Sequence, residues 1–289
     1  MRLRAPGKSI ILKPVHANVG VEMAYRKALM RIVCEVHNET LDLLAALYPT
    51  PLAQDADPAA ALRAQMRKLG KKWQADMDLH ARAIAEGFVS GALHAGDFAL
   101  QQHLKDAGFA VKFQPTEASM KAFDDALAEN IKLIKSIPEQ YISGASDLIS
   151  ESVHSGQGLA EVSKALGGRV DLERIWKRPP QDSDETWRTK TQRRANFIAR
   201  DQNNRANGII NKVRNLELGI TKAIWRHSGA GVTPREEHVG WDGTTFDLET
   251  GKFSDVDGEF VWAGSQCNCR CVSLGIIPGL DYGEGEDAA

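Results

Sequence analysis

Apolar residues recur at intervals of three or four along most of the first 218 positions, a spacing typical of amphipathic helices that bury one face. One long pattern begins at Pro58 and fades near Gly91 and Gly96, and another is interrupted at Pro138. Proline and glycine therefore divide the helical region into several pieces. Besides the helix from Pro58, the predicted helices cover residues 21–48, 97–108, 120–149, 159–166 and 191–218.

After Gly219 the spacing of apolar residues changes from 3.6 to 2, which indicates strands over 220–227 and 267–274. The sequence therefore predicts an α+β fold. A helical N-terminal half and a long basic helix are followed by a small antiparallel β-rich C-terminal module. The module's turns are expected at Asp242-Gly243, Thr250-Gly251 and Asp257-Gly258, and its short helix at the capping box Thr233-Pro234-Arg235-Glu236.

Changes in composition along the chain predict its domain organisation. Prolines and glycines dominate the first twenty residues, and Gln114-Pro115-Thr116 separates two helical patterns. The last residues are small and acidic, which is typical of a disordered segment. We expect an extended arm over 1–20, a helical N-terminal region over 21–115, a second domain over 116–278 and an acidic disordered tail over 279–289.

Charge is distributed unevenly. The 36 Lys and Arg residues nearly balance the 38 Asp and Glu residues, for a net charge of −2, so the whole chain is not a polycation. However, Arg169–Arg226 holds 14 basic and 7 acidic residues, whereas residues 232–289 hold 3 and 12. Such an asymmetry attracts a nucleic acid, a partner protein or the other half of the same fold. No apolar run reaches the roughly 18 residues of a membrane span, and no signal peptide is expected.

The cysteines suggest a metal site. Cys267, Cys269 and Cys271 alternate, which would place three thiols on one strand face, and His238 lies upstream with His227 as a further candidate. Thiolates and imidazole are the donors that zinc prefers. Against this, C-x-C is a poorer chelating spacing than C-x-x-C. The alternative is a set of reduced thiols packed in a core, with His238 bonded to a backbone carbonyl.

Two other groups of residues are candidates for catalysis or for phosphate binding. Arg235, His238 and Asp242 form a candidate acid–base or phosphate-handling cluster, because catalysis of that kind needs a histidine with a carboxylate partner. No G-x-S-x-G motif and no phosphate-binding loop occurs. The long helix could instead bind phosphates, or it could be a solvated or partner-facing surface. Its candidate binding residues are Arg193, Arg194, Arg200, Arg205, Lys212 and Arg214.

Several segments occur in the order found in one family. They are Asn130–Pro138, Ile198–Gln202, Gly219-Ile220, Ile224–Arg226, Ser228-Gly229, Arg235-x-x-His238, Asp242-Gly243 and Asn268–Cys271. In this ordered set, residues 117–275 resemble the phage Mu protein F-like head morphogenesis (minor capsid protein) family. Two positions depart from its pattern: Cys267 stands where an apolar residue is usual, and Ala263-Gly264 where proline-glycine is usual. The matching positions are Asp201, Gln202, Trp225, Arg235, His238, Gly243, Cys269 and Cys271.

The resemblance implies a minor capsid protein of a tailed phage, a virion protein that acts in head morphogenesis without an established catalytic activity. It implies synthesis in the host cytoplasm and incorporation into the procapsid near the portal protein. Major capsid protein, scaffolding protein and DNA are further candidate partners, and no membrane is involved. The alternative hypothesis is a phage-delivered enzyme, either a metal-assisted nuclease or a nucleotide-modifying effector, centred on Arg235, His238 and Asp242.

Overall fold

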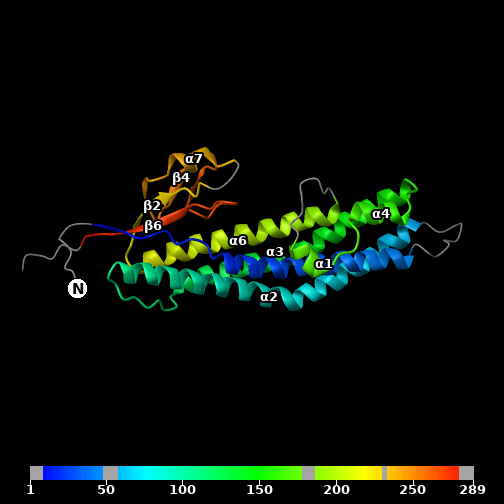
Figure 1. The fold of residues 1–289 in the computed structure, drawn as a ribbon, viewed down its shortest axis with the longest axis horizontal. Coiled ribbons are helices and arrows are strands. Elements are labelled where there is room, and N and C mark those ends of the chain that lie inside the picture. The colour runs from blue at the N-terminus through cyan, green and yellow to red at the C-terminus, as the bar shows by residue number, and fades with distance from the viewer. Residues whose placement is uncertain (1–8, 48–57, 178–185, 230–232, 280–289) are drawn as a thin grey trace, which may run out of the picture. The chain divides into compact units, whose positions relative to one another are not determined.

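The computed structural model describes residues 9–47, 58–177, 186–229 and 233–279 (Figure 1). The fold is α+β as predicted, with long helices first and a small antiparallel module afterwards. No helix in these ranges combines the length and the apolar character needed to cross a membrane. The long helical part comprises α1 (Val19–Leu47), α2 (Pro58–Asp106), α3 (Glu117–His154), α4 (Leu159–Leu166), α5 (Leu172–Lys177) and α6 (Trp187–Glu217).

Two of the predicted helix breaks do not occur. Helix α2 continues through Gly96 into the segment expected to be a separate helix, and α3 continues through Pro138. A glycine costs an exposed helix about 1 kcal/mol, and an internal proline removes one backbone hydrogen bond. In both helices buried residues flank the weak point, Ala92 and Leu100 in α2 and Ile137 and Tyr141 in α3. Tertiary packing therefore outweighs the local preference.

The chain separates into two compact units, each built from discontinuous segments. Unit 1 comprises residues 1–19, 89–126 and 201–289, and unit 2 comprises 20–88 and 127–200. Both units draw on residues from each side of the boundary expected near residue 115, so the proposed division at that position stays a prediction. The expected tail over 279–289 lies almost entirely outside the described residues.

Unit 1 contains the sheet, whose four strands are ordered β1-β6-β2-β3 with antiparallel pairing of every neighbouring pair. Strand β1 belongs to the predicted N-terminal arm and pairs with β6. A separate two-stranded antiparallel sheet is formed by β4 and β5. The strands are β1 (Ile10–Ile11), β2 (Lys222–Arg226), β3 (Thr245–Asp247), β4 (Lys252–Ser254), β5 (Glu259–Val261) and β6 (Val272–Ile277), and α7 (Glu236–Gly240) follows β2.

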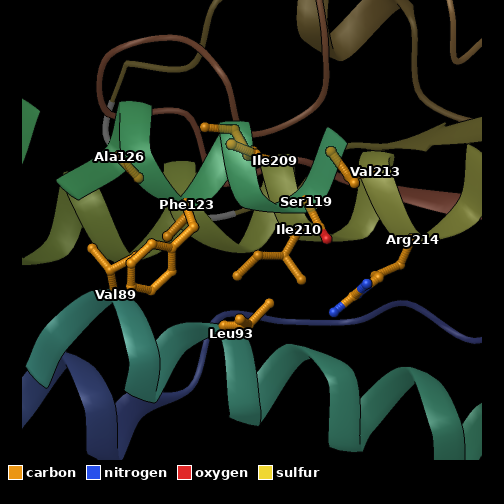
Figure 2. Close-up of a pocket in the computed structure, with 11 residues that line it drawn as sticks. Val89, Leu93, Ser119, Phe123, Ala126, Ile209, Ile210, Val213 and Arg214 are labelled. Atoms are coloured by element: carbon orange, nitrogen blue, oxygen red, sulfur yellow. The ribbon is translucent and has the colours of Figure 1, made fainter. Parts of the chain in front are cut away.

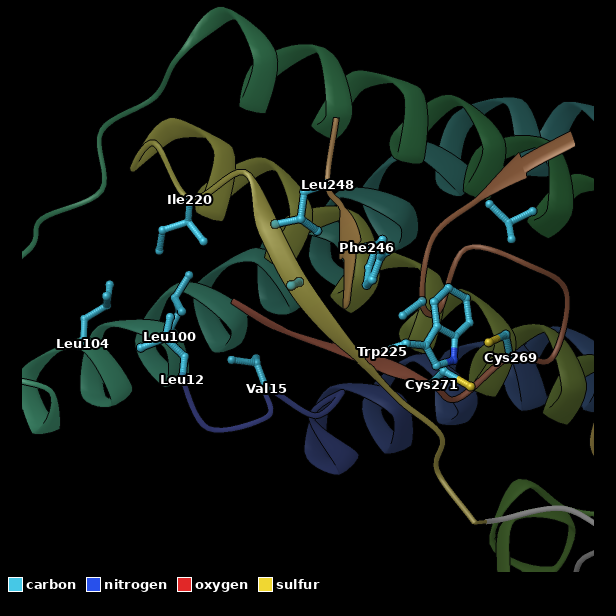
Figure 3. Packing of buried hydrophobic residues seen from close by; sticks show 13 residues of the cluster. Leu12, Val15, Leu100, Leu104, Ile220, Trp225, Phe246, Leu248, Cys269 and Cys271 are labelled. Atoms are coloured by element: carbon cyan, nitrogen blue, oxygen red, sulfur yellow. The ribbon is translucent and has the colours of Figure 1, made fainter. Parts of the chain in front are cut away.

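The core of unit 1 joins the sheet to the arm and to the end of α2. Trp225 of β2 is fully buried in this core, where its ring meets that of Phe246 edge-on, and Leu248 packs into the core farther from Trp225 (Figure 3). Leu12 of the arm packs with Leu104 of α2 in the same cluster. The sheet, the arm and one helix therefore share a single hydrophobic core, which fixes the position of the loops around Trp225.

A second apolar region of unit 1 lies between α2, α3 and α6. Figure 2 shows Phe123 of α3 and Ile210 of α6 facing Val89 and Leu93 of α2 around a small cavity, with Arg214 at its edge. The lining is almost wholly apolar apart from Ser119 and this arginine. It continues the packing of the three helices and brings no cluster of reactive side chains together.

Unit 2 is a helical unit with one buried histidine. His37 of α1 lies 2.7 Å from the hydroxyl of Tyr141 through Nδ1 and 2.5 Å from the carbonyl oxygen of Gly168 through Nε2. Gly167 ends α4 in the left-handed conformation, as its place after the predicted 159–166 helix indicated. His37 therefore ties α1 to α3 and to the turn after α4.

Candidate metal centre

Three side chains predicted as metal ligands meet in unit 1. Nδ1 of His238 lies 3.5 Å from Sγ of Cys269 and 3.7 Å from Sγ of Cys271. All three residues are buried, and their donor atoms lie within 4.8 Å of one another. Two thiols and an imidazole at this separation can hold a metal ion.

Aromatic residues fix the orientation of the histidine ring. His238 stacks on Trp241 at 5.2 Å between ring centroids and meets Trp225 edge-on at 5.0 Å. Its Nε2 is buried and has no hydrogen-bond partner among the described residues, so within them this atom does not make the bond to a backbone carbonyl expected of a purely structural histidine. Packing against two tryptophans thus directs Nδ1 at the thiols.

The two thiols are electrostatically unequal. The Cys271 thiol donates a hydrogen bond to Cys269, which holds the pKa of Cys269 well below its usual value, and His238 contributes in the same direction. The same hydrogen bond, together with burial, raises the pKa of Cys271. The indole nitrogen of Trp225 has no nitrogen or oxygen acceptor among the described residues and faces the Cys271 sulfur (Figure 3). A cation bound by these side chains would displace the thiol protons.

Cys267 lies apart from this group, which contradicts its prediction as a ligand. Residues 267–271 form a turn rather than the expected strand, and β6 begins only at Val272. Asn268 has a φ of 58°, in the left-handed region, so the alternation of side chains is broken between Cys267 and Cys269. Cys267 is exposed as a result. His227 also lies outside the group, and its Nδ1 accepts a hydrogen bond from the amide of Gly229.

Helix α6 anchors the cysteine turn. The carboxylate of Asp201 accepts hydrogen bonds from the backbone amide of Asn268 and the side-chain amide of Gln202. Two turns further along, Gly208 lies against Ala263 and Gly264, where an added Cβ would be 2.7 Å from the Ala263 carbonyl oxygen. Asp201 therefore positions the loop that carries the thiols, and Gln202 hydrogen-bonds Asp201.

The proposed catalytic cluster is not assembled. Arg235 donates to the carbonyl oxygen of Cys267, and the carboxylate of Asp242 accepts from the amide of His227 and from Arg226. Neither side chain forms a hydrogen bond with His238 in the described part of the chain. Gly243, with a φ of 78°, completes the turn after Asp242. These residues shape the loops around the histidine rather than a reaction centre.

The asparagines of α6, whose place among the basic residues suggested contacts with phosphates, donate instead to backbone carbonyl oxygens. The amides of Asn203 and Asn207 donate to the carbonyl oxygens of Asn18 and Val15 in the arm, and that of Asn211 donates to Ser273 of β6. Their spacing of four residues places them on one helix face. That spacing was the available signal, but nothing in the sequence identified backbone of the arm and β6 as the acceptors.

The basic residues of α6 are less available than a phosphate-binding surface requires. Arg214 is buried and forms hydrogen-bonded ion pairs with Asp97 and Glu217, so it serves the interior of unit 1. Lys212 lies 3.3 Å above the Trp262 ring, and burial lowers its pKa. In unit 2, burial likewise lowers the pKa of Arg194. Binding by the remaining residues stays a prediction, and all of them are partly buried: Arg193, Arg200 and Arg205.

Comparisons with known proteins add little to this description. No family model matches the chain. No solved structure matches it either. A protein of Haemophilus influenzae described as uncharacterized is 27% identical over 277 residues, which cover 94% of this chain. The chain spans 56% of that relative's length. Functional inference therefore depends on the residues and their geometry.

Proposed function

We propose that this chain is a minor head protein of a tailed phage that acts in head morphogenesis and docks at the portal. The proposal rests on the resemblance of residues 117–275 to the phage Mu protein F-like family. One structural observation adds support to it. Positions scattered over 70 residues in that resemblance are joined in one module, where Asp201 holds the turn before Cys269 and Trp225 packs on His238. Contacts of this kind between motif positions are expected when the motif residues stabilise one shared domain.

We further propose that the metal is zinc, held by His238, Cys269 and Cys271. Tetrahedral geometry with Zn–N of about 2.0 Å and Zn–S of about 2.3 Å requires an N–S separation of about 3.5 Å. The observed separations are 3.5 and 3.7 Å. The group supplies three of the four donors that zinc takes, and Cys267 is too exposed to be the fourth as the turn is folded. Bound zinc would cross-link α7 to the turn before β6, which stabilises a small module.

The enzymatic alternative has weaker support. It requires Arg235, His238 and Asp242 to converge, and their hydrogen bonds go to different loops. His238 and both thiols are buried, and His238 stacks on Trp241, so the structure exposes almost none of their surface to a substrate. A docking and assembly role does not need such exposure.

The test is quantitative mass spectrometry of gradient-purified particles and procapsids from the phage that encodes the chain. We expect a few copies per particle, and loss of the chain from particles assembled without the portal protein. A capsid protein measured in the same samples controls for particle yield. Recovery of the chain only from the host lysate would refute the proposal. Retention in particles that lack the portal would move the docking site to the capsid or scaffolding protein.

A further inference from the structure

The β4–β5 hairpin exposes two aromatic rings. Phe253 and Phe260 are cross-strand partners, with ring centroids 5.2 Å apart in an edge-to-face contact. They are 48% and 54% exposed, and Val256 in the connecting turn is 79% exposed. These three side chains, here called the hairpin patch, are an unusual concentration of exposed apolar surface for strands of three residues each.

The register of the hairpin prevents this patch from turning inward. On the opposite face, Ser254 and Val261 are buried. The Ser254 hydroxyl lies 2.7 Å from a carboxylate oxygen of Glu237 on α7, and the same carboxylate accepts the amide of Asp255 at 2.8 Å. The inner face is thus held against α7 by these hydrogen bonds. The solvent-facing side of an antiparallel sheet that covers a core is normally polar. This hairpin shows an aromatic one.

The charges around the patch restrict what can bind there. Asp255, Asp257 and Glu259 are all exposed within the hairpin. They repel nucleic acid, anionic lipid and the same face of a second copy of this chain. A protein segment with aliphatic and basic side chains matches both the rings and the carboxylates. The two-stranded sheet also has no third strand among the described residues, so it offers backbone groups at its edges.

We propose that the hairpin patch is a docking surface for an aliphatic and basic segment of a partner protein. This inference rests on the proposed function, since the partner is the component that recruits the chain to the particle. Phe253 and Phe260 supply the apolar contact, and the three carboxylates select a basic partner. The site is separate from the metal centre, and two contacts connect them: α7 carries both His238 and Glu237, and Gln266 beside the cysteine turn donates a hydrogen bond to Asp257 of the hairpin.

Two readouts test the patch with the full-length chain. The first is copy number per particle for the F253S/F260S variant, with L79S/F98S as a matched control at residues that are 75% and 64% exposed elsewhere. We expect at least a tenfold loss for the hairpin variant and none for the control. Unchanged thermal unfolding of both variants shows that the loss is one of docking. Wild-type copy number for F253S/F260S overturns the inference while leaving the head-protein proposal intact.

The second readout does not depend on particles. Purified chain is titrated with a synthetic amphipathic Leu/Lys peptide and with its Leu/Glu counterpart. We expect binding of the Leu/Lys peptide only, weakened at least tenfold by F253S/F260S and also by D255K/E259K. Equal affinity of the wild type and F253S/F260S overturns the inference even if the chain proves absent from particles, an absence that would by itself refute the proposed function.

Discussion

At the scale of single residues, Arg214 was predicted to bind phosphates at the surface but is buried in an ion pair. The sequence places it among basic residues that could bind phosphates. In the structure its guanidinium is buried, and it donates to both carboxylate oxygens of Asp97 and to Glu217. The carboxylates come from α2 and from the same turn of α6, and a distance of 117 positions along the chain hides the first of them from sequence patterns.

Substitution of Arg214 should therefore destabilise unit 1. R214A leaves two carboxylates without their cation, and we expect a loss of about 3 kcal/mol in the free energy of unfolding, measured by urea denaturation. The matched control is R82A, since Arg82 forms an exposed pair with Glu86 and should cost roughly 0.5 kcal/mol or less. Equal effects of the two substitutions would contradict the buried role of Arg214.

His37 gives a pH dependence to unit 2. Burial lowers its pKa from 6.5 to about 4, so the unfolded chain binds a proton more readily than the folded chain between these values. The neutral histidine supports the fold fully above about pH 6.5, and that stability is lost as the pH falls toward 4, by up to about 3 kcal/mol. We expect H37Q to be less stable at pH 7 but to lose less stability on acidification, in urea titrations at successive pH values.

The exposed His80 supplies the control for this measurement. H80Q should keep the full pH dependence of the wild type, because the substitution leaves the buried His37 and its two hydrogen-bond partners unchanged. A wild-type unfolding free energy that changes as little as that of H37Q over the same range would exclude the assigned role of His37.

At the scale of elements, close backbone packing of α6 on the cysteine turn is a specific requirement. G208A would place a methyl group 2.7 Å from the Ala263 carbonyl oxygen, so the helix or the turn must shift. We expect a cost of about 1–3 kcal/mol and faster hydrogen exchange in residues 263–271. The control is G87A, also inside a helix but with open space around its Cβ, which should stabilise the chain by about 0.5–1 kcal/mol. Equal effects of both changes would refute the close approach.

The elements also show how far sequence patterns reach. Periodicity located the long helices and the β-rich module, because each buries an apolar face that repeats locally. It failed at Gly96 and Pro138, where packing by distant residues keeps a helix intact. It also failed at Cys267–Cys271, where a left-handed Asn268 replaces strand alternation. Residue types and the alternating spacing predicted His238, Cys269 and Cys271 as ligands together with Cys267, but the position of Cys267 outside the group depends on a backbone angle that the pattern does not encode.

At the scale of the whole molecule, the basic charge of residues 169–226 and the acidic charge of residues 232–289 differ in how far they are neutralised by neighbouring side chains. Part of the basic charge in α6 is neutralised internally, as Arg214 shows. The acidic charge of the hairpin stays at the surface, next to exposed aromatic rings. The proposed docking of the C-terminal module onto a protein partner would use this acidic and aromatic surface, and the proposed metal ion would keep the loops of that module in place.

The central claim is that one metal ion holds these loops, and the most direct test is the number of zinc ions per chain by native mass spectrometry. We predict one ion in the wild type and in C267S, and none in C269S/C271S. Removal of the ion by a chelator should lower the thermal midpoint of the wild type by about 5–10 °C. A wild-type chain that binds no zinc, or loss of zinc in C267S as complete as in C269S/C271S, would contradict the account.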